Sequence, residues 1–153
     1  MLAVFLFIEA LSPPSAVPTK PVATQTPAQA MDYLVRTLPH VQLFDAWEGG
    51  WSEAPLDRAK FDDMCELTTG APFVRLFYDS GEQHDAPARQ SWRVDLSAIS
   101  GVGQNGKRAG YKLSSNPNMI LGFAAPDVET AHGIAVALET MRKACADDAI
   151  PSS

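Results

Sequence analysis

Two stretches of the chain repeat apolar residues with the spacing of an amphipathic helix. The first stripe has the i, i+3, i+4, i+7 spacing and consists of Met31, Leu34, Val35 and Leu38. The sequence Thr26-Pro27-Ala28-Gln29 precedes it with the spacing of a capping box, in which the first and last residues cap each other's backbone N–H groups. Because Pro39 cannot continue a helix, the pattern predicts a helix from 27 to 38.

The second stripe lies later in the chain and consists of Ile134, Leu138, Met141 and Cys145. Asp127 stands before it in an N-cap position, and Arg142 and Lys143 fall in its last turn, where the helix dipole favours positive charge. The pattern predicts a helix of about 19 residues, long enough to lie across a small sheet.

The region between the two predicted helices contains strand patterns. Residues 73–78 are rich in β-forming side chains, and residues 92–96 and 109–113 alternate apolar with polar residues. We expect the last two segments to pair as a hairpin around Asn105-Gly106, through a connection longer than two residues. The apolar segment 119–124 then adds a third strand.

Two further segments have no clear periodicity. Between residues 40 and 70 helical and strand spacings fit equally well, and we expect the piece after Pro55 to form a short helix. Residues 82–89 are polar and are expected to form a loop.

These elements predict an α+β domain over residues 27–149. We expect an antiparallel β-meander that packs against the long C-terminal helix, with the N-terminal helix as an additional element. Residues 1–11 form a signal-like apolar segment, residues 12–26 a proline-rich linker, and residues 150–153 a tail.

The apolar run at the start of the sequence bears on the cellular compartment. Leu2–Ile8 is an unbroken apolar run that matches the hydrophobic region of a secretory signal, and it is far shorter than the roughly 20 residues of a membrane-spanning helix. It predicts a periplasmic or secreted protein whose mature chain has no integral membrane span. The alternative is a cytoplasmic protein with an apolar tail.

The chain contains two cysteines, Cys65 and Cys145. An even number of cysteines behind an export signal predicts a disulfide, and the alternative is a pair of buried thiols. Because Cys145 lies on the apolar stripe of the last helix, its sulfur faces the core, and Cys65 must lie beside it for a bond to form. Without CxxC spacing, and with scattered histidines, neither a metal site nor a cofactor is predicted.

The balance of 12 basic and 18 acidic residues gives a net charge of −6. A negatively charged protein repels the phosphate backbone, so no nucleic-acid partner is expected.

Two motifs suggest chemistry but stand in the wrong context. Gly101–Gly106 spells G-x-G-x-x-G, yet the segment after it alternates as a strand instead of opening a helix, which favours a hairpin over a dinucleotide-binding turn. Ser52 lies in a sequence close to a nucleophile elbow, but Gly49-Gly50 precedes it and Pro55 follows, so no strand-turn-helix can form there. We therefore predict no catalytic residue.

Trp47 and Trp51 flank the sequence Glu48-Gly49-Gly50 and are the candidate ligand-binding residues. Two indole rings could stack on a sugar or another apolar ligand, with Glu48 as a hydrogen-bond acceptor. The alternative is that the two tryptophans hold the loop on the core.

Part of the chain resembles a known family. Residues 92–102, followed by two further predicted strands and a final helix that ends near Cys145, resemble the second half of a pleckstrin-homology-like domain over about residues 92–146. The resemblance implies a meander closed by a helix. The helix at 27–38 and the Gly49-Gly50 region depart from the four leading strands of that family, and Lys107-Arg108 is too small a basic cluster to imply phosphoinositide binding.

Two functions follow as hypotheses. The first is an exported, non-catalytic module that binds an unknown partner protein or small ligand, because no set of nucleophile, base and orienting residue is recognisable. The alternative is a small hydrolase that uses carboxylates such as Asp45 and Glu48 near Trp47.

Overall fold

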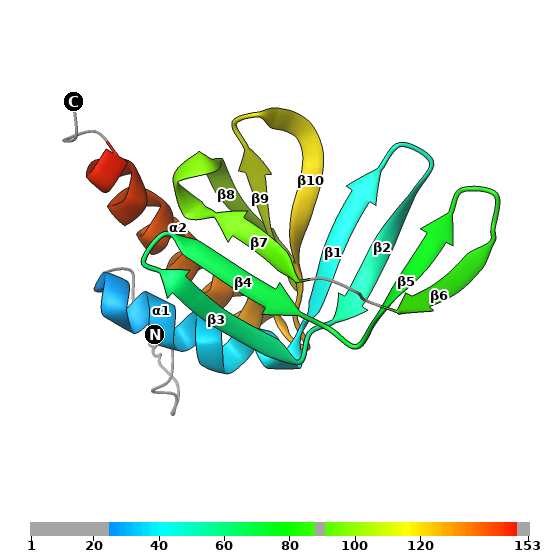
Figure 1. The fold of residues 1–153 in the computed structure, drawn as a ribbon, viewed down its shortest axis with the longest axis horizontal. Coiled ribbons are helices and arrows are strands. Elements are labelled where there is room, and N and C mark those ends of the chain that lie inside the picture. The colour runs from blue at the N-terminus through cyan, green and yellow to red at the C-terminus, as the bar shows by residue number, and fades with distance from the viewer. Residues whose placement is uncertain (1–24, 88–90, 150–153) are drawn as a thin grey trace, which may run out of the picture.

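The computed structural model describes residues 25–87 and 91–149, and all structural statements refer to these residues. They form a β-rich α+β fold with ten strands and two α-helices (Figure 1). The helices are α1 (Pro27–Thr37) and α2 (Val128–Ala149), with short 3-10 helices η2 (Leu38–His40) and η3 (Leu96–Ala98). The strands are β1 (Gln42–Trp47), β2 (Gly50–Pro55), β3 (Arg58–Asp63), β4 (Glu66–Gly70), β5 (Phe73–Tyr78), β6 (Gln83–Pro87), β7 (Trp92–Asp95), β8 (Ile99–Asn105), β9 (Arg108–Leu113) and β10 (Asn116–Ala124).

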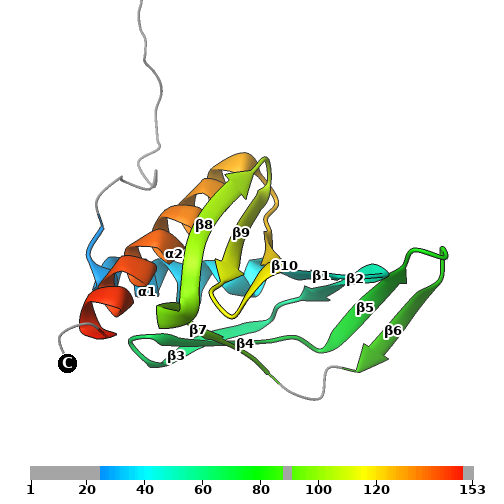
Figure 2. The same cartoon turned by 90° about the horizontal axis from the view of Figure 1, so that it is seen from above.

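The strands form two antiparallel sheets. The larger sheet has seven strands in the order β6-β5-β2-β1-β10-β9-β8, and the smaller has three in the order β3-β4-β7. Helix α2 packs on β8, β9 and η3, and α1 packs on α2 and β3. Figure 2 shows the consequence: both helices lie at one end of the larger sheet, and β5 and β6 extend away from them at the other end. The predicted fold class is therefore confirmed.

Both predicted helices form, and their caps are the ones that the sequence indicates. The backbone N–H of Gln29 donates to the Thr26 side chain at 3.1 Å, and the N–H of Thr26 donates to the Gln29 side chain at 3.0 Å. At the second helix, the N–H of Thr130 donates to the Asp127 carboxylate at 2.7 Å. Helix α2 has 22 residues, slightly more than predicted.

One hydrophobic core joins both sheets to both helices. Its largest fully buried side chains come from different layers and include Leu34 of α1, Leu67 of β4, Phe123 of β10, and Ile134, Leu138 and Met141 of α2. Helix α2 thus buries the apolar stripe that predicted it.

Two segments differ from the sequence-based expectation. The short helix expected after Pro55 is wrong, because β3 and β4 occupy this region. In β3, Ala59 and Phe61 are half-buried whereas Arg58 and Lys60 are exposed, which is a strand period hidden among charges. The loop expected over 82–89 is also wrong, since most of it forms β6, an exposed edge strand with no core-facing pattern to reveal it.

The expected hairpin has a different first strand. β7 pairs with β4 in the smaller sheet, and the partner of β9 is β8, which sequence reasoning had assigned to the connection. Because Asn105 pairs with Arg108, the turn has two central residues, Gly106 and Lys107, and Gly106 has a φ of 61°. This left-handed conformation favours glycine, so Asn105-Gly106 marked the turn correctly and the predicted longer connection is wrong.

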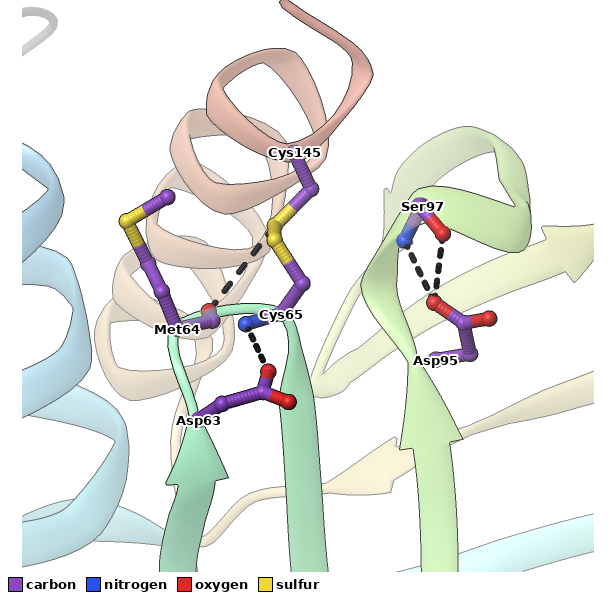
Figure 3. The surroundings of a disulfide bond; sticks show 6 residues. All are labelled: Asp63, Met64, Cys65, Asp95, Ser97 and Cys145. Atoms are coloured by element: carbon purple, nitrogen blue, oxygen red, sulfur yellow. Dashed lines mark hydrogen bonds between the residues drawn. A yellow bond between two sulfur atoms is a disulfide. The ribbon is translucent and has the colours of Figure 1, made fainter. Parts of the chain in front are cut away.

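Cys65 and Cys145 lie in the geometry of a disulfide, with Cα atoms 5.7 Å apart. Figure 3 shows that Cys65, in the β3–β4 turn, meets Cys145 near the end of α2. The backbone N–H of Cys65 donates to the Asp63 carboxylate at 2.8 Å, and the Cys65 carbonyl accepts from the N–H of Leu96 at 2.8 Å. These contacts fix the turn against η3, and the predicted pairing is confirmed.

The predicted signal segment (1–11) and all but the end of the predicted linker (12–26) lie outside the described residues. Within the described part, neither helix is both long and apolar enough to cross a membrane.

Candidate ligand-binding groove

The three residues predicted to bind a ligand all lie in the β1–β2 hairpin. Glu48 is in the turn, Trp47 ends β1, and Trp51 is the second residue of β2. Trp47 pairs with Gly50, so Trp51, the next residue along the strand, points to the opposite face of the sheet. The structure therefore does not bring the two tryptophans together on one surface.

Each tryptophan packs against an aromatic residue of β5. Trp47 meets Tyr78 edge to face, with ring centroids 6.3 Å apart, and Trp51 stacks on Phe77 with centroids 4.9 Å apart. Cross-strand aromatic pairs of this kind stabilise a sheet. These contacts favour a structural role for both indoles, and their ligand-binding role stays a prediction.

Asp45 and Glu48, the carboxylates of the hydrolase hypothesis, have different surroundings. Asp45 lies within β1, where one carboxylate oxygen is buried without a hydrogen-bond partner among the described residues. Burial raises the pKa of the Asp45 carboxyl above its ordinary value. Burial, and then the negative charge of Asp45, raise the pKa of Tyr111. Glu48 instead occupies the hairpin turn and is exposed.

A groove of about 660 Å³ lies on the outer face of β1, β10, β9 and β8. Its floor is a row of paired residues that runs across the sheet: Gly103 pairs with Gly110, Gly110 with Gly122, and Gly122 with Phe44. Their neighbours along the strands, such as Ala109 and Phe123, are buried on the other face, toward α2. Along this row Gly103 is exposed and Gly110 is half-buried, whereas Gly122 is buried, so the open backbone lies on β8 and β9.

Two cations stand on either side of this floor. Arg108 and Lys112 lie two residues before and two residues after Gly110 on β9, so their side chains share its face. At about 3.4 Å per residue, their Cα atoms are roughly 14 Å apart. The guanidinium carbon of Arg108 lies 4.3 Å from the centre of the Phe44 ring, which is the geometry of a cation–π contact.

The charges around the groove are unusual for this acidic chain. Within residues 25–87 and 91–149, most lysines and arginines have a carboxylate oxygen within 4.0 Å. The described cations without such a partner are Lys107, Arg108 and Lys112, all on β9 or the turn before it. No Asp, Glu, His, Cys, Ser or Thr is among the described residues that line the groove.

The glycines of the floor have different structural reasons. A Cβ at Gly122 would lie 2.5 Å from the carbonyl oxygen of Ala109, so the close approach of two strands requires glycine there. A Cβ at Gly103 would meet nothing within 4 Å, and Gly103 has no positive φ. Glycine weakens a strand, and one without a packing reason is typical of a site where another molecule approaches the backbone.

Sequence reasoning missed this groove although it singled out Gly101–Gly106. The row depends on the register of three strands, and Gly110 and Gly122 lie outside that motif. The usable signal was the recurrence of glycine in the segments that follow the motif, beside the unusual pair Lys107-Arg108.

No protein-family model and no curated protein matches this sequence. Among solved structures, the chain is similar to inner membrane complex sub-compartment protein 3 from Toxoplasma gondii, with 17% identity and a TM-score of 0.45. The match covers 80% of this chain and 90% of that chain. A likeness at this level supports no statement about function, and the pleckstrin-homology-like resemblance stays a prediction.

Proposed function

We propose that the chain is an exported, non-catalytic module that binds a small ligand, and that the groove over Gly103, Gly110 and Gly122 is its binding site. The observation that carries this proposal is the combination of open glycine backbone at Gly103 and Gly110 with two cations that have no carboxylate partner in the described residues. The volume of the groove, about 660 Å³, falls in the range of sites for small ligands.

The lining also favours binding over turnover. Hydrolysis requires a nucleophile or a general base close to the bound substrate. The described lining residues supply neither a carboxylate nor an imidazole, thiol or aliphatic hydroxyl. The groove can hold and orient a molecule, and the ionisable side chains among its described lining residues are Arg108, Lys112 and the buried Tyr111.

Export to the periplasm or the medium rests on two supports. Disulfides persist in oxidising compartments, and the Cys65–Cys145 pair has disulfide geometry. The apolar run Leu2–Ile8 has the length of a signal's hydrophobic region. Intact-mass analysis of the mature protein from its native host, with and without reduction, tests both supports at once.

The binding role is tested by native mass spectrometry of the same material, in wild type and in Gly103→Val. A valine at this position meets no protein atom within 4 Å at its Cβ and projects into the groove. We expect a bound small molecule in the wild type and its loss in Gly103→Val. Gln83→Val is the matched control, because it adds the same side chain to the exposed strand β6. Equal retention in all three proteins would place the ligand elsewhere.

The hydrolase alternative keeps one supporting observation: burial raises the pKa of the Asp45 carboxyl, and a raised pKa is a property of carboxyl groups that act as general acids. The double variant Asp45→Asn, Glu48→Gln separates the two functions. A hydrolase would lose turnover and stay folded, whereas a binding module retains its ligand in the groove.

A further inference from the structure

We propose that the ligand of the groove is a small molecule with a flat apolar body and a carboxylate, which Arg108 binds while the body lies on the glycine floor. This inference rests on the proposed function and names the class of ligand. It follows from three properties of the site: the state of Arg108, the chemistry of the floor, and the position of Lys112.

Arg108 is already arranged to receive a carboxylate. Its guanidinium lies over the ring of Phe44, with 4.3 Å between the guanidinium carbon and the ring centre. A guanidinium is planar because its charge is delocalised, and its fork of N–H groups matches the two oxygens of a carboxylate. Among the described residues no acidic side chain forms an ion pair with Arg108. An anion that pairs with Arg108 would therefore come from outside the described residues.

The floor favours an apolar, flat body. The backbone groups of Gly110 and Gly122 lie within a paired ladder, where strand hydrogen bonds occupy the N–H and C=O groups. On this surface Gly103 is exposed and Gly110 is half-buried, so part of the floor is glycine backbone without side chains, and Phe44 and Ala46 line the β1 end. The row crosses three strand spacings, about 14 Å, which suits a molecule of two or three fused rings.

Lys112 adds a second positive charge without fixing a geometry. Its ammonium is a point charge on a flexible stem, so it attracts anions but does not select the planar carboxylate as an arginine does. Lys112 thus adds positive charge to the groove in a chain whose net charge is −6. Removing Lys112 should weaken binding less than removing Arg108, and mainly through the association rate.

The test is calorimetric titration of the full chain with two probes of the same shape, naphthalene carboxylate and the neutral naphthalene carboxamide. We expect the carboxylate to bind at least tenfold more tightly than the amide. Arg108→Gln should weaken carboxylate binding roughly ten- to hundredfold, the range expected for a hydrogen-bonded charge pair, and leave amide binding unchanged. Arg108→Lys keeps the positive charge but loses the planar guanidinium, so its affinity for the carboxylate should lie between those of the wild type and Arg108→Gln.

The control variant is Arg36→Gln, which removes the same charge from the exposed face of α1, where Arg36 pairs only with Asp32. It should bind the carboxylate like the wild type, because a surface pair on the helix does not touch the groove. Gly103→Val should abolish binding of both probes. Thermal melting confirms that each variant is folded.

Several results would overturn the inference. Equal affinity for the two probes would show that the groove selects an apolar body without an anion. Carboxylate binding that survives both Arg108→Gln and Gly103→Val would place the anion site elsewhere. If decanoate bound more tightly than naphthalene carboxylate, the ligand would have a flexible apolar chain instead of a flat body. If neither probe binds while a native ligand is still lost in Gly103→Val, the ligand class is wrong and the proposed function stands.

Discussion

The two ends of the seven-stranded sheet are held in different ways. At the β8–β10 end, α2 covers one face, and buried side chains such as Ala109 and Phe123 are fully excluded from solvent. At the other end, β2, β5 and β6 extend beyond the helices, as Figure 1 shows. Every residue of β5 is half-buried, and Val74 reaches the edge of the core.

The uncovered end, which consists of β2, β5 and β6, is stabilised by pairs between neighbouring strands. Trp51 stacks on Phe77, and Arg75 forms an ion pair with Asp85 at 3.0 Å. Cross-strand pairs contribute roughly 0.2–1 kcal/mol each, less than the burial of a whole side chain. Most of the groove's floor lies on strands whose other face packs against α2. A preformed binding site needs such packing to stay rigid, so the covered end is the better place for one.

The largest expected effect concerns the disulfide, which belongs to the covered end. Closing a loop of 80 positions stabilises the folded state by about 4.5 kcal/mol in the chain-entropy model. Replacing Cys65 and Cys145 by alanine should therefore lower the melting temperature by at least about 10 °C. Hydrogen exchange should show the loss at the end of α2 and at the β3–β4 turn, with little change in β5 and β6.

The control for this prediction is a reducing agent. It should lower the melting temperature of the wild type and leave that of the double alanine variant unchanged. A double variant as stable as the wild type would show that packing of α2, and not the covalent link, holds the covered end.

The second prediction compares one phenylalanine from each end. Phe123 is fully buried, so Phe123→Ala should lower the free energy of unfolding by about 4 kcal/mol through lost burial and the cavity left behind. Phe77 is half-buried and stacks on Trp51, so Phe77→Ala should cost about 1.5 kcal/mol. Urea denaturation of both variants measures the difference. Equal losses would contradict the contrast between the two ends and point to a covering layer over β5.

The two helices of the covered end were the most predictable elements from sequence. Its helices could be predicted because each one carries a local signal, a cap at Thr26 or Asp127 followed by an apolar stripe. In β9 the alternation of buried Ala109 and Tyr111 with more exposed neighbours equally reports burial on one face. These signals arise because one face of each element meets a core.

The missed elements lack that one-sided burial. β6 is exposed along nearly its whole length, and in β3 the half-buried Ala59 and Phe61 are few among charged neighbours. The groove could not be read because it depends on register: Gly103, Gly110 and Gly122 become one surface only when three strands pair. Sequence reasoning found the hairpin but gave β9 the wrong partner, since nothing local assigned Trp92–Asp95 to the smaller sheet.

The smallest expected effect concerns the border between the two ends, which β1 crosses. Leu43 is buried, whereas Asp45 and Trp47, further along the same face, are half-buried. Burial disfavours the charged form of the Asp45 carboxyl, so its pKa in the folded state lies above the ordinary value of 3.8. The folded state therefore carries a cost at neutral pH that the unfolded state does not.

Asp45→Asn should remove this cost and raise the melting temperature by about 2 °C at neutral pH, which corresponds to a fraction of 1 kcal/mol. Most carboxyl groups have a lowered pKa in the folded state and stabilise the protein as the pH rises. Because the folded-state pKa of Asp45 is raised, its ionisation instead destabilises the folded state as the pH rises from the ordinary to the raised pKa value. The gain should thus shrink as the pH falls through that window and vanish below pH of about 3.8, where both states are protonated. Melting curves of both proteins from acidic to neutral pH measure it. A gain that is the same at every pH would mean that Asn improves packing, and a loss at neutral pH would mean that the Asp45 charge has a favourable partner.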